Sequence, residues 1–241
     1  DKDWLEEVEK GIRWYVRPHE LDSGEVVLLG QRDSRDPNNG FMASSLFILE
    51  RNSDGELTGW NRFPVPEHVN LFDFVKADLD GDGQRETVAI DKNEKMLIFK
   101  NVNELLWVSD GEYGGSLIHF GPDSAAAEDV SSFQSGGMSS ELVADWEYMY
   151  IPGRMLVVDV DNDGREEIIV GRNQYQGLRI LPNTRSYSGG TVSCVKWNDG
   201  AMNELWKTRR YPGYLSDYSF IFTGNTTPLG DEEKAREARL F

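Results

Sequence analysis

Short runs of apolar and β-branched residues, separated by polar turns, recur along the chain. Six of these runs align as two groups of three: residues 87–90, 96–99 and 104–107, and residues 167–170, 191–197 and 203–206. Runs this short, rich in Val and Ile and bounded by Gly, Asn and Asp, are typical of β-strands. The third run of each group also contains a Glu-Leu-(Leu)-Trp sequence. The chain therefore repeats a unit of strands and is predicted to be all-β.

Four antiparallel strands joined by short turns are the pattern of a β-propeller blade. The repeat predicts one blade at residues 71–109 and another at 154–208, and a related pattern at 12–64 predicts a third. Residues 214–223 resemble the first strand of a further blade. About three blades and one strand do not close a ring, because propellers typically have at least four blades. We therefore expect another protein chain, or a second copy of this one, to complete the propeller.

Three segments do not follow the strand pattern. Residues 110–151 are rich in Gly, Ser and Ala; they either hide an irregular blade or, as we interpret them, form a long surface insertion. Residues 230–241 contain helix formers with acids first and bases last, an order that suits the helix dipole, so a helical tail is predicted there. A similar short helix is expected at residues 3–10.

A nine-residue acidic loop occurs twice, each time between two apolar runs. Both copies follow the pattern D-x-D-x-D-G-x-x-E, the first at residues 78–86 and the second at 159–167. Four carboxylates in so short a loop repel one another strongly unless a cation lies among them. Oxygen-only ligands favour a hard cation, and this spacing suits Ca²⁺ better than Mg²⁺, which keeps several waters. The alternative is a pair of acidic turns that hold no ion. In the 12–64 unit, residues 17–25 occupy the place of the loop and lack its aspartates.

The expected ligands are the side chains at positions one, three, five and nine and the backbone carbonyl at position seven. These are Asp78, Asp80, Asp82, Gln84 and Glu86 in the first loop, and Asp159, Asp161, Asp163, Arg165 and Glu167 in the second. Gly83 and Gly164 lie where the loop must turn sharply, at a backbone angle that only glycine adopts at low cost. An EF-hand would instead place its glutamate at position twelve and helices on both sides. The sequence thus predicts two strand-loop-strand calcium sites.

The chain is acidic, with 42 Asp and Glu against 25 Lys and Arg and a net charge of −17. It has no basic stripe that would release counterions from a nucleic acid, so no nucleic-acid partner is expected, and an anionic membrane surface is disfavoured. No apolar run approaches the length of a membrane span. The one cysteine, Cys194, lies in a strand-like run and is interpreted as a core residue, and three scattered histidines argue against a zinc site.

The two loops and their flanking strands resemble the FG-GAP/VCBS repeat family, the calcium-binding propeller repeats also found in the integrin α-subunit head. The resemblance rests on residues 77–83 with Glu86 and on residues 158–164 with Glu167, and it extends more loosely over residues 12–223. It implies an extracytoplasmic protein that binds or scaffolds other molecules more often than it catalyses a reaction.

These observations favour a non-enzymatic module in which two structural Ca²⁺ ions stabilise the blades while the protein binds another protein or a surface glycan. Calcium sites of extracellular modules have Kd values on the order of 10⁻⁴ to 10⁻³ M, which suit the outside of a cell but not the cytosol. One alternative is a calcium-dependent polysaccharide lyase or glycoside hydrolase, with Asp145 and Glu147 beside Trp146 as candidate acids. A second is an integrin-like adhesion head, with residues 225–227 as a candidate N-glycosylation sequon.

Overall fold

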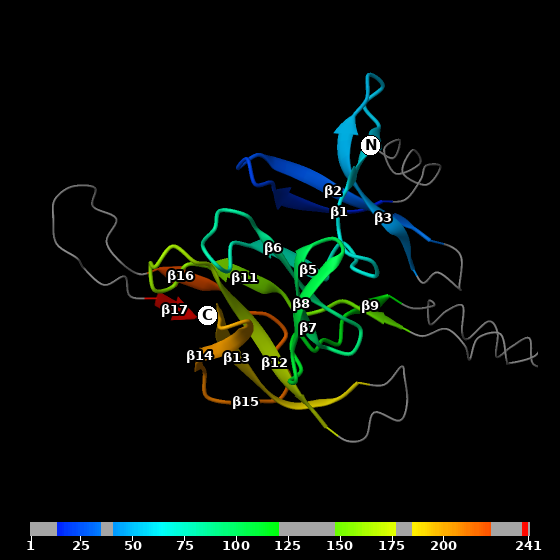
Figure 1. The fold of residues 1–241 in the computed structure, drawn as a ribbon. Helices are drawn as coiled ribbons and strands as arrows, with labels where there is room; N and C mark the ends of the chain where they lie inside the picture. The colour runs from blue at the N-terminus through cyan, green and yellow to red at the C-terminus, as the bar shows by residue number, and fades with distance from the viewer. Residues whose placement is uncertain (1–13, 35–40, 121–147, 177–184, 223–237, 241) are drawn as a thin grey trace, which may run out of the picture.

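The computed structural model describes residues 14–34, 41–120, 148–176, 185–222 and 238–240 of the 241-residue chain. Within these ranges the regular structure consists of antiparallel β-strands, and no helix occurs. The predicted all-β class is therefore confirmed for this part of the chain. Figure 1 shows three larger sheets, built in turn from the blue and cyan, the green, and the yellow-green and orange segments.

In each of the three larger sheets, four strands pair in chain order. The first sheet contains β1 (Trp14–Glu20), β2 (Val26–Asp33), β3 (Met42–Arg51) and β4 (Leu57–Phe63). The second contains β5 (Phe74–Ala77), β6 (Glu86–Ile90), β7 (Met96–Asn101) and β8 (Glu104–Val108). The third contains β11 (Met155–Val158), β12 (Glu167–Tyr175), β13 (Tyr187–Asn198) and β14 (Ala201–Lys207), and β15 (Tyr211–Pro212) also pairs with β13. Two smaller pairs join β9 (His119–Phe120) to β10 (Met149–Tyr150) and β16 (Phe220–Phe222) to β17 (Ala238–Leu240).

The second strands of the second and third sheets are buried on both faces. In β6, Val88 and Ile90 point into one hydrophobic cluster and Ala89 points into another. In β12, Ile168 and Ile169 are divided between two clusters in the same way. All five side chains are at most 2% exposed. Because successive side chains of a strand point to opposite faces, each of these sheets must be covered on both sides.

The hydrophobic core lies between the stacked sheets. One cluster joins Ile98 of β7 to Val195 of β13, and therefore packs the second sheet against the third. Another joins Leu29 and Leu46 of the first sheet to Phe74 of β5, and therefore packs the first sheet against the second. Burial of each such side chain stabilises the fold by about 1.5–3 kcal/mol. The first strands β5 and β11 also contact each other, so the two acidic loops that follow them are brought together.

The helical tail predicted over residues 230–241 is wrong at its end. Residues Ala238–Leu240 form β17, which pairs with β16 so that Leu240 lies opposite Phe220 and Ala238 opposite Phe222. The edge of β16 offers backbone hydrogen-bonding groups, and such tertiary pairing overrides the high intrinsic helix propensity of Ala, Arg and Leu. Residues 230–237 and the helix expected at residues 3–10 lie outside the described residues.

The beginning of segment 110–151, which the sequence predicts to be a surface insertion, contacts the core. Tyr113 is only 8% exposed and belongs to the cluster between the second and third sheets. The backbone N–H of Gly114 donates to the carbonyl of Gly171 on β12 at 2.8 Å, and the N–H of Gly153 donates to the carbonyl of Gly114, also at 2.8 Å. The first bond holds the beginning of the segment against the third sheet, and the second joins Gly153, just beyond the end of the segment, to Gly114. Residues 121–147 lie outside the described ranges.

Candidate functional site

The two acidic loops connect β5 to β6 and β11 to β12. Their tight path requires positive backbone φ angles at two positions of each loop. Gly83 and Gly164, at the predicted turn position, have φ angles of 85° and 86°. Gly81 and Asn162, two residues earlier, have φ angles of 78° and 57°. Glycine adopts this region freely, and Asn tolerates it better than most residues do, so the residue types match the backbone.

In each loop the structure gathers the carboxylates of positions one, three and nine. Carboxylate oxygens within 4.8 Å of one another come from Asp78, Asp80 and Glu86 in the first loop, and from Asp159, Asp161 and Glu167 in the second. The closing glutamates are buried, with Glu86 4% and Glu167 0% exposed, whereas Asp80 and Asp161 reach solvent. Six of the predicted ligands are thus placed in two matching groups.

The carboxylates of position five are not part of these groups. Asp82 accepts a hydrogen bond from the backbone N–H of Gln84 at 2.8 Å, and Asp163 accepts one from the N–H of Arg165 at 3.0 Å. These bonds stabilise the turn of the loop. The carbonyl groups of Gln84 and Arg165 remain predicted ligands.

The buried glutamates indicate that the donor set fits a hard cation. Burial raises the pKa of Glu86, and the charges of Asp80 and Asp82 raise it further. Burial also raises the pKa of Glu167, although its Oε2 accepts the N–H of Val160 at 2.7 Å and its Oε1 lies 3.1 Å from the ammonium nitrogen of Lys196. Burying a carboxylate beside other carboxylates is costly, and a divalent cation among the oxygens would offset both the burial and the repulsion. The residues therefore fit Ca²⁺, which binds carboxylate and carbonyl oxygens.

The second loop is also contacted by a positive charge from the chain itself. The ammonium nitrogen of Lys196 on β13 lies 2.7 Å from Asp161, 2.6 Å from Asp163 and 3.1 Å from Glu167. Burial alone would lower the pKa of Lys196, but the hydrogen bonds to these carboxylates raise it. Lys196 is therefore positively charged at neutral pH and competes with any cation for the same oxygens.

Lys100 on β7 has the corresponding place beside the first loop. Phe99 pairs with Thr87 across the second sheet as Val195 pairs with Ile168 across the third, and a lysine follows in both cases. Lys100 is nevertheless exposed, and no carboxylate of the described residues forms an ion pair with it. The two candidate cation sites therefore differ in their counter-charge although their loops follow one pattern.

Position eight of each loop connects the two loops. The carboxylate of Glu166 accepts a hydrogen bond from the N–H of Asp78 at 2.7 Å, and the N–H of Glu166 donates to the carbonyl of Asp78 at 2.8 Å. Arg85, at position eight of the first loop, forms an ion pair with Glu166 at 3.3 Å. Gly81 permits this close approach, because a Cβ atom there would lie only 3.3 Å from Cγ of Arg165. The two candidate sites are thus parts of one connected structure.

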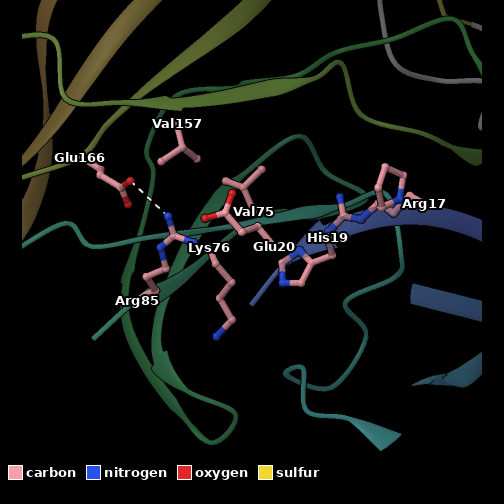
Figure 2. Close-up of a pocket in the computed structure, with 9 residues that line it drawn as sticks. Arg17, His19, Glu20, Val75, Lys76, Arg85, Val157 and Glu166 are labelled. Carbon is pink, nitrogen blue, oxygen red and sulfur yellow. Dashed lines mark hydrogen bonds and ion pairs between the residues drawn. The ribbon is translucent and has the colours of Figure 1, made fainter. Parts of the chain in front are cut away.

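Arg85 and Glu166 also line a hollow of about 450 Å³ between the first strands of the three larger sheets (Figure 2). The other lining residues are Arg17, Pro18, His19 and Glu20 of β1, Val75 and Lys76 of β5, and Val157 of β11. Three of these nine residues are Arg or Lys and two are Glu, although acidic residues outnumber Lys and Arg in the chain as a whole. We call this hollow the basic pocket.

The side chains of the basic pocket have few counterions. Arg17 donates from Nη1 to the carbonyl of Phe74 at 2.9 Å and lies 4.3 Å above the Phe74 ring, but its buried Nε has no hydrogen-bond partner among the described residues. Burial lowers the pKa of Arg17 to about 10. Burial, followed by the charges of Arg17, Lys76 and Arg85, lowers the pKa of His19 to about 4. The interior of the pocket is therefore electropositive.

Lys196 and the basic pocket are not predicted from the sequence. A lysine stands at the corresponding place of both aligned units, but the sequence does not distinguish Lys196, which contacts its loop, from Lys100, which is exposed. The pocket left no local signal, because its basic residues come from three separate segments. Residues 17–20, part of the 17–25 segment that occupies the place of an acidic loop in the sequence alignment, belong to β1 and line this pocket.

Of the other features predicted from the sequence, some lie among the described residues and some outside them. Cys194 is buried at 0% exposure, as expected for a core residue. Asp145, Trp146, Glu147 and the sequon at residues 225–227 lie outside the described residues. No helix in the described ranges is long and apolar enough to cross a membrane.

No protein-family model matches the chain, and no curated protein matches it. Among solved structures, the chain is similar to the Bacillus licheniformis rhamnogalacturonan lyase PL11, with a TM-score of 0.34 and 13% identity over 81% of this chain and 33% of that one. It is also similar to the exotype rhamnogalacturonan lyase YesX, with a TM-score of 0.32 and 17% identity over 81% of this chain and 32% of that one. The chain thus spans about a third of the length of these structures. Similarity this low says nothing about its activity.

Proposed function

We propose that the chain is a calcium-stabilised module of β-propeller blades of the FG-GAP/VCBS type. It acts outside the cytoplasm, binds another protein or a surface glycan, and does not catalyse a reaction. The observation that carries the proposal is the pair of carboxylate groups, each gathered within 4.8 Å in a loop of the same D-x-D-x-D-G-x-x-E pattern. Two independent loops with one ligand geometry support two sites for one kind of ion.

The ions would serve the fold. Each loop joins the first two strands of a sheet, so a cation among its carboxylates holds those strands together. Binding to the folded state alone adds to the free energy of unfolding, by about 2.7 kcal/mol per site at a free Ca²⁺ concentration of a hundred times Kd. Weak sites therefore stabilise the module at extracellular calcium concentrations and not at cytosolic ones.

Sheets that follow one another and stack face to face support the propeller part of the proposal. The outer face of the first sheet supports the proposal that another chain binds this module. Val16, Val26 and Leu28 are 43%, 66% and 39% exposed on the neighbouring strands β1 and β2. Apolar side chains gathered on an exposed sheet face are typical of interaction surfaces. A further chain, or a second copy of this one, would cover this face. A polysaccharide lyase or glycoside hydrolase stays an alternative prediction.

The proposal is tested by size-exclusion chromatography with light scattering and by thermal melting, both in Ca²⁺ and in EGTA. Two sites that together contribute about 5 kcal/mol should raise the melting temperature by roughly 10 °C or more. Assembly to a dimer or larger species should depend on Ca²⁺ as well. A monomer with the same melting curve in both buffers would contradict the proposal. Glu67→Gln removes a carboxylate that is 89% exposed and lies outside the loops, and it should leave the calcium effect unchanged.

A further inference from the structure

We propose that the basic pocket binds the carboxylate of an acidic sugar, such as a uronic acid unit of a glycan, through Arg17 and Lys76. This inference rests on the proposed binding function and deepens it, because it names the class of glycan and the residues that hold it. Three observations carry it: two positive charges without a close ion pair among the described residues, the mixed character of the lining, and the size of the hollow.

Two positive charges of the pocket form no close ion pair with a described carboxylate, and Asp73 acts on Arg17, and Asp22 and Glu86 on Lys76, only from a longer distance. Arg85 is paired with Glu166, whose carboxylate also accepts the N–H of Asp78. Arg17 and Lys76 form no ion pair with any described carboxylate, in a chain with 42 acidic and 25 basic residues. The buried Nε of Arg17 has no hydrogen-bond partner among the described residues, and burial lowers the pKa of Arg17 to about 10, so folding buries this charge at a cost. A bound anion offsets that cost, which is why such arrangements mark binding sites.

The rest of the lining favours a sugar over a bare anion. Glu20 is exposed and its carboxylate can accept hydrogen bonds from hydroxyl groups, whereas it would repel a second anion placed beside it. Pro18, Val75 and Val157 offer a small apolar surface for the C–H face of a pyranose ring. A uronic acid carries a carboxylate, hydroxyl donors and such a face on one ring. The volume of about 450 Å³ also falls within the usual range of small-molecule sites.

The arrangement of the side chains gives the ligand a direction. Figure 2 shows Arg17 and His19 of β1 at one end of the pocket, the Arg85–Glu166 ion pair at the other, and Lys76 between them. A sugar held by Arg17 and Lys76 therefore lies across β1 and β5 with His19 beside it. Because Arg85 and Glu166 belong to the acidic loops, the test is made at saturating Ca²⁺, where both loops are held in one state.

The test is calorimetric titration of the full chain with glucuronate, glucose and acetate in saturating Ca²⁺. Glucuronate should bind at least about ten-fold more tightly than either of the others, because only it combines the charge with the ring. Lys76→Gln should weaken glucuronate binding by about ten-fold, the loss expected for one charge-assisted hydrogen bond. Arg17→Lys keeps the charge and should weaken it less. Lys92→Gln, at an exposed lysine in a turn away from the pocket, is the matched control and should bind as the unaltered chain does.

Four results would overturn the inference: glucose or acetate binding as tightly as glucuronate, Lys76→Gln binding like Lys92→Gln, a glutamate-rich peptide binding where glucuronate does not, or no glucuronate binding at all. Equal melting temperatures of the two lysine variants ensure that both are folded. If Ca²⁺ raises the melting temperature but glucuronate does not bind, this inference is wrong while the calcium proposal is supported. If Ca²⁺ has no effect while glucuronate binds with the expected variant pattern, the calcium proposal is wrong and the proposal that the basic pocket binds an acidic sugar is supported.

Discussion

Asp78 and Glu166, each from a different acidic loop, are joined by a reciprocal pair of hydrogen bonds. The N–H of Asp78 donates to the carboxylate of Glu166 at 2.7 Å, and the N–H of Glu166 donates to the carbonyl of Asp78 at 2.8 Å. Asp78 is the first ligand of one candidate site, and Glu166 immediately precedes Glu167, the closing ligand of the other. We infer that a cation at one loop influences the backbone of the other.

Glu166→Ala should therefore destabilise the chain and weaken calcium binding at the first loop. The change removes the acceptor for the N–H of Asp78 and the ion-pair partner of Arg85. We expect the free energy of unfolding to fall by about 1–3 kcal/mol, the usual cost of losing charge-assisted hydrogen bonds. Urea unfolding with and without Ca²⁺ measures the effect. Glu67→Ala, at an exposed glutamate, should change it by less than about 0.5 kcal/mol, and equal effects of the two would contradict the coupling.

Lys196→Met should have opposite effects with and without calcium. In EGTA it leaves the carboxylates of Asp161, Asp163 and Glu167 without their ammonium partner, so the melting temperature should fall. In Ca²⁺ the competing charge is gone, and the affinity of the second loop should rise by about ten-fold. Calorimetric titration and melting curves in both buffers measure the two effects.

Lys100→Met is the matched control for this prediction. Lys100 occupies the corresponding register beside the first loop but is exposed and makes no ion pair with the described carboxylates. It should leave the melting temperature in EGTA unchanged. If Lys196→Met behaves like Lys100→Met, Lys196 does not act as the internal counter-charge of the second loop.

The sequence predicts the strands and the loops well for a physical reason. The runs at residues 87–90 and 167–170 are local patterns of β-branched side chains buried on both faces, and they appear at the cores of β6 and β12. The aspartates of the two acidic loops form local patterns too, because a tight loop brings alternate residues together. Lys196 and the basic pocket depend on pairing between distant segments, which composition does not encode. Residues 238–240 show the converse, since β16 draws helix-forming residues into a strand.

Acidification should destabilise the chain through His19. Its pKa is lowered from 6.5 to about 4, first by burial and then by Arg17, Lys76 and Arg85, while Asp22 acts in the opposite direction. Between those two pH values the unfolded chain binds a proton that the native chain does not. The free energy of unfolding therefore falls as the pH is lowered through this window, by about 1–2 kcal/mol after allowing for solvent screening.

Asp73 acts against His19 in part of this window. Burial raises its pKa from 3.8 to about 6, so the native chain binds a proton at a higher pH than the unfolded chain does. The loss of stability caused by burying the ionised Asp73 carboxylate is absent below about pH 3.8 and fully present above about pH 6. Urea unfolding from pH 7 to about pH 4 separates the two groups. His19→Gln should remove the loss on acidification and Asp73→Asn should enlarge it; the reverse order would contradict these assignments.

Cys194 should be unreactive in the native chain. Its side chain is fully buried, and burial, followed by the charges of Glu167 and Asp161, raises its pKa to about 12. Since the thiolate is the reactive form, a thiol reagent should modify the protein only after unfolding. The rate of modification should therefore follow the unfolding equilibrium and slow when Ca²⁺ is added. Rapid modification of the native chain would contradict the burial.

The central claim is that the two acidic loops each bind one Ca²⁺ ion, and a calcium titration by calorimetry tests it most directly. The unaltered chain should bind two ions, and Asp80→Asn and Asp161→Asn should each lose one of them, in the first and second loop respectively. The site that remains in Asp161→Asn should be the tighter one, because Lys196 competes only at the second loop. A titration without binding, or two variants that still bind two ions with unchanged affinity, would contradict the account.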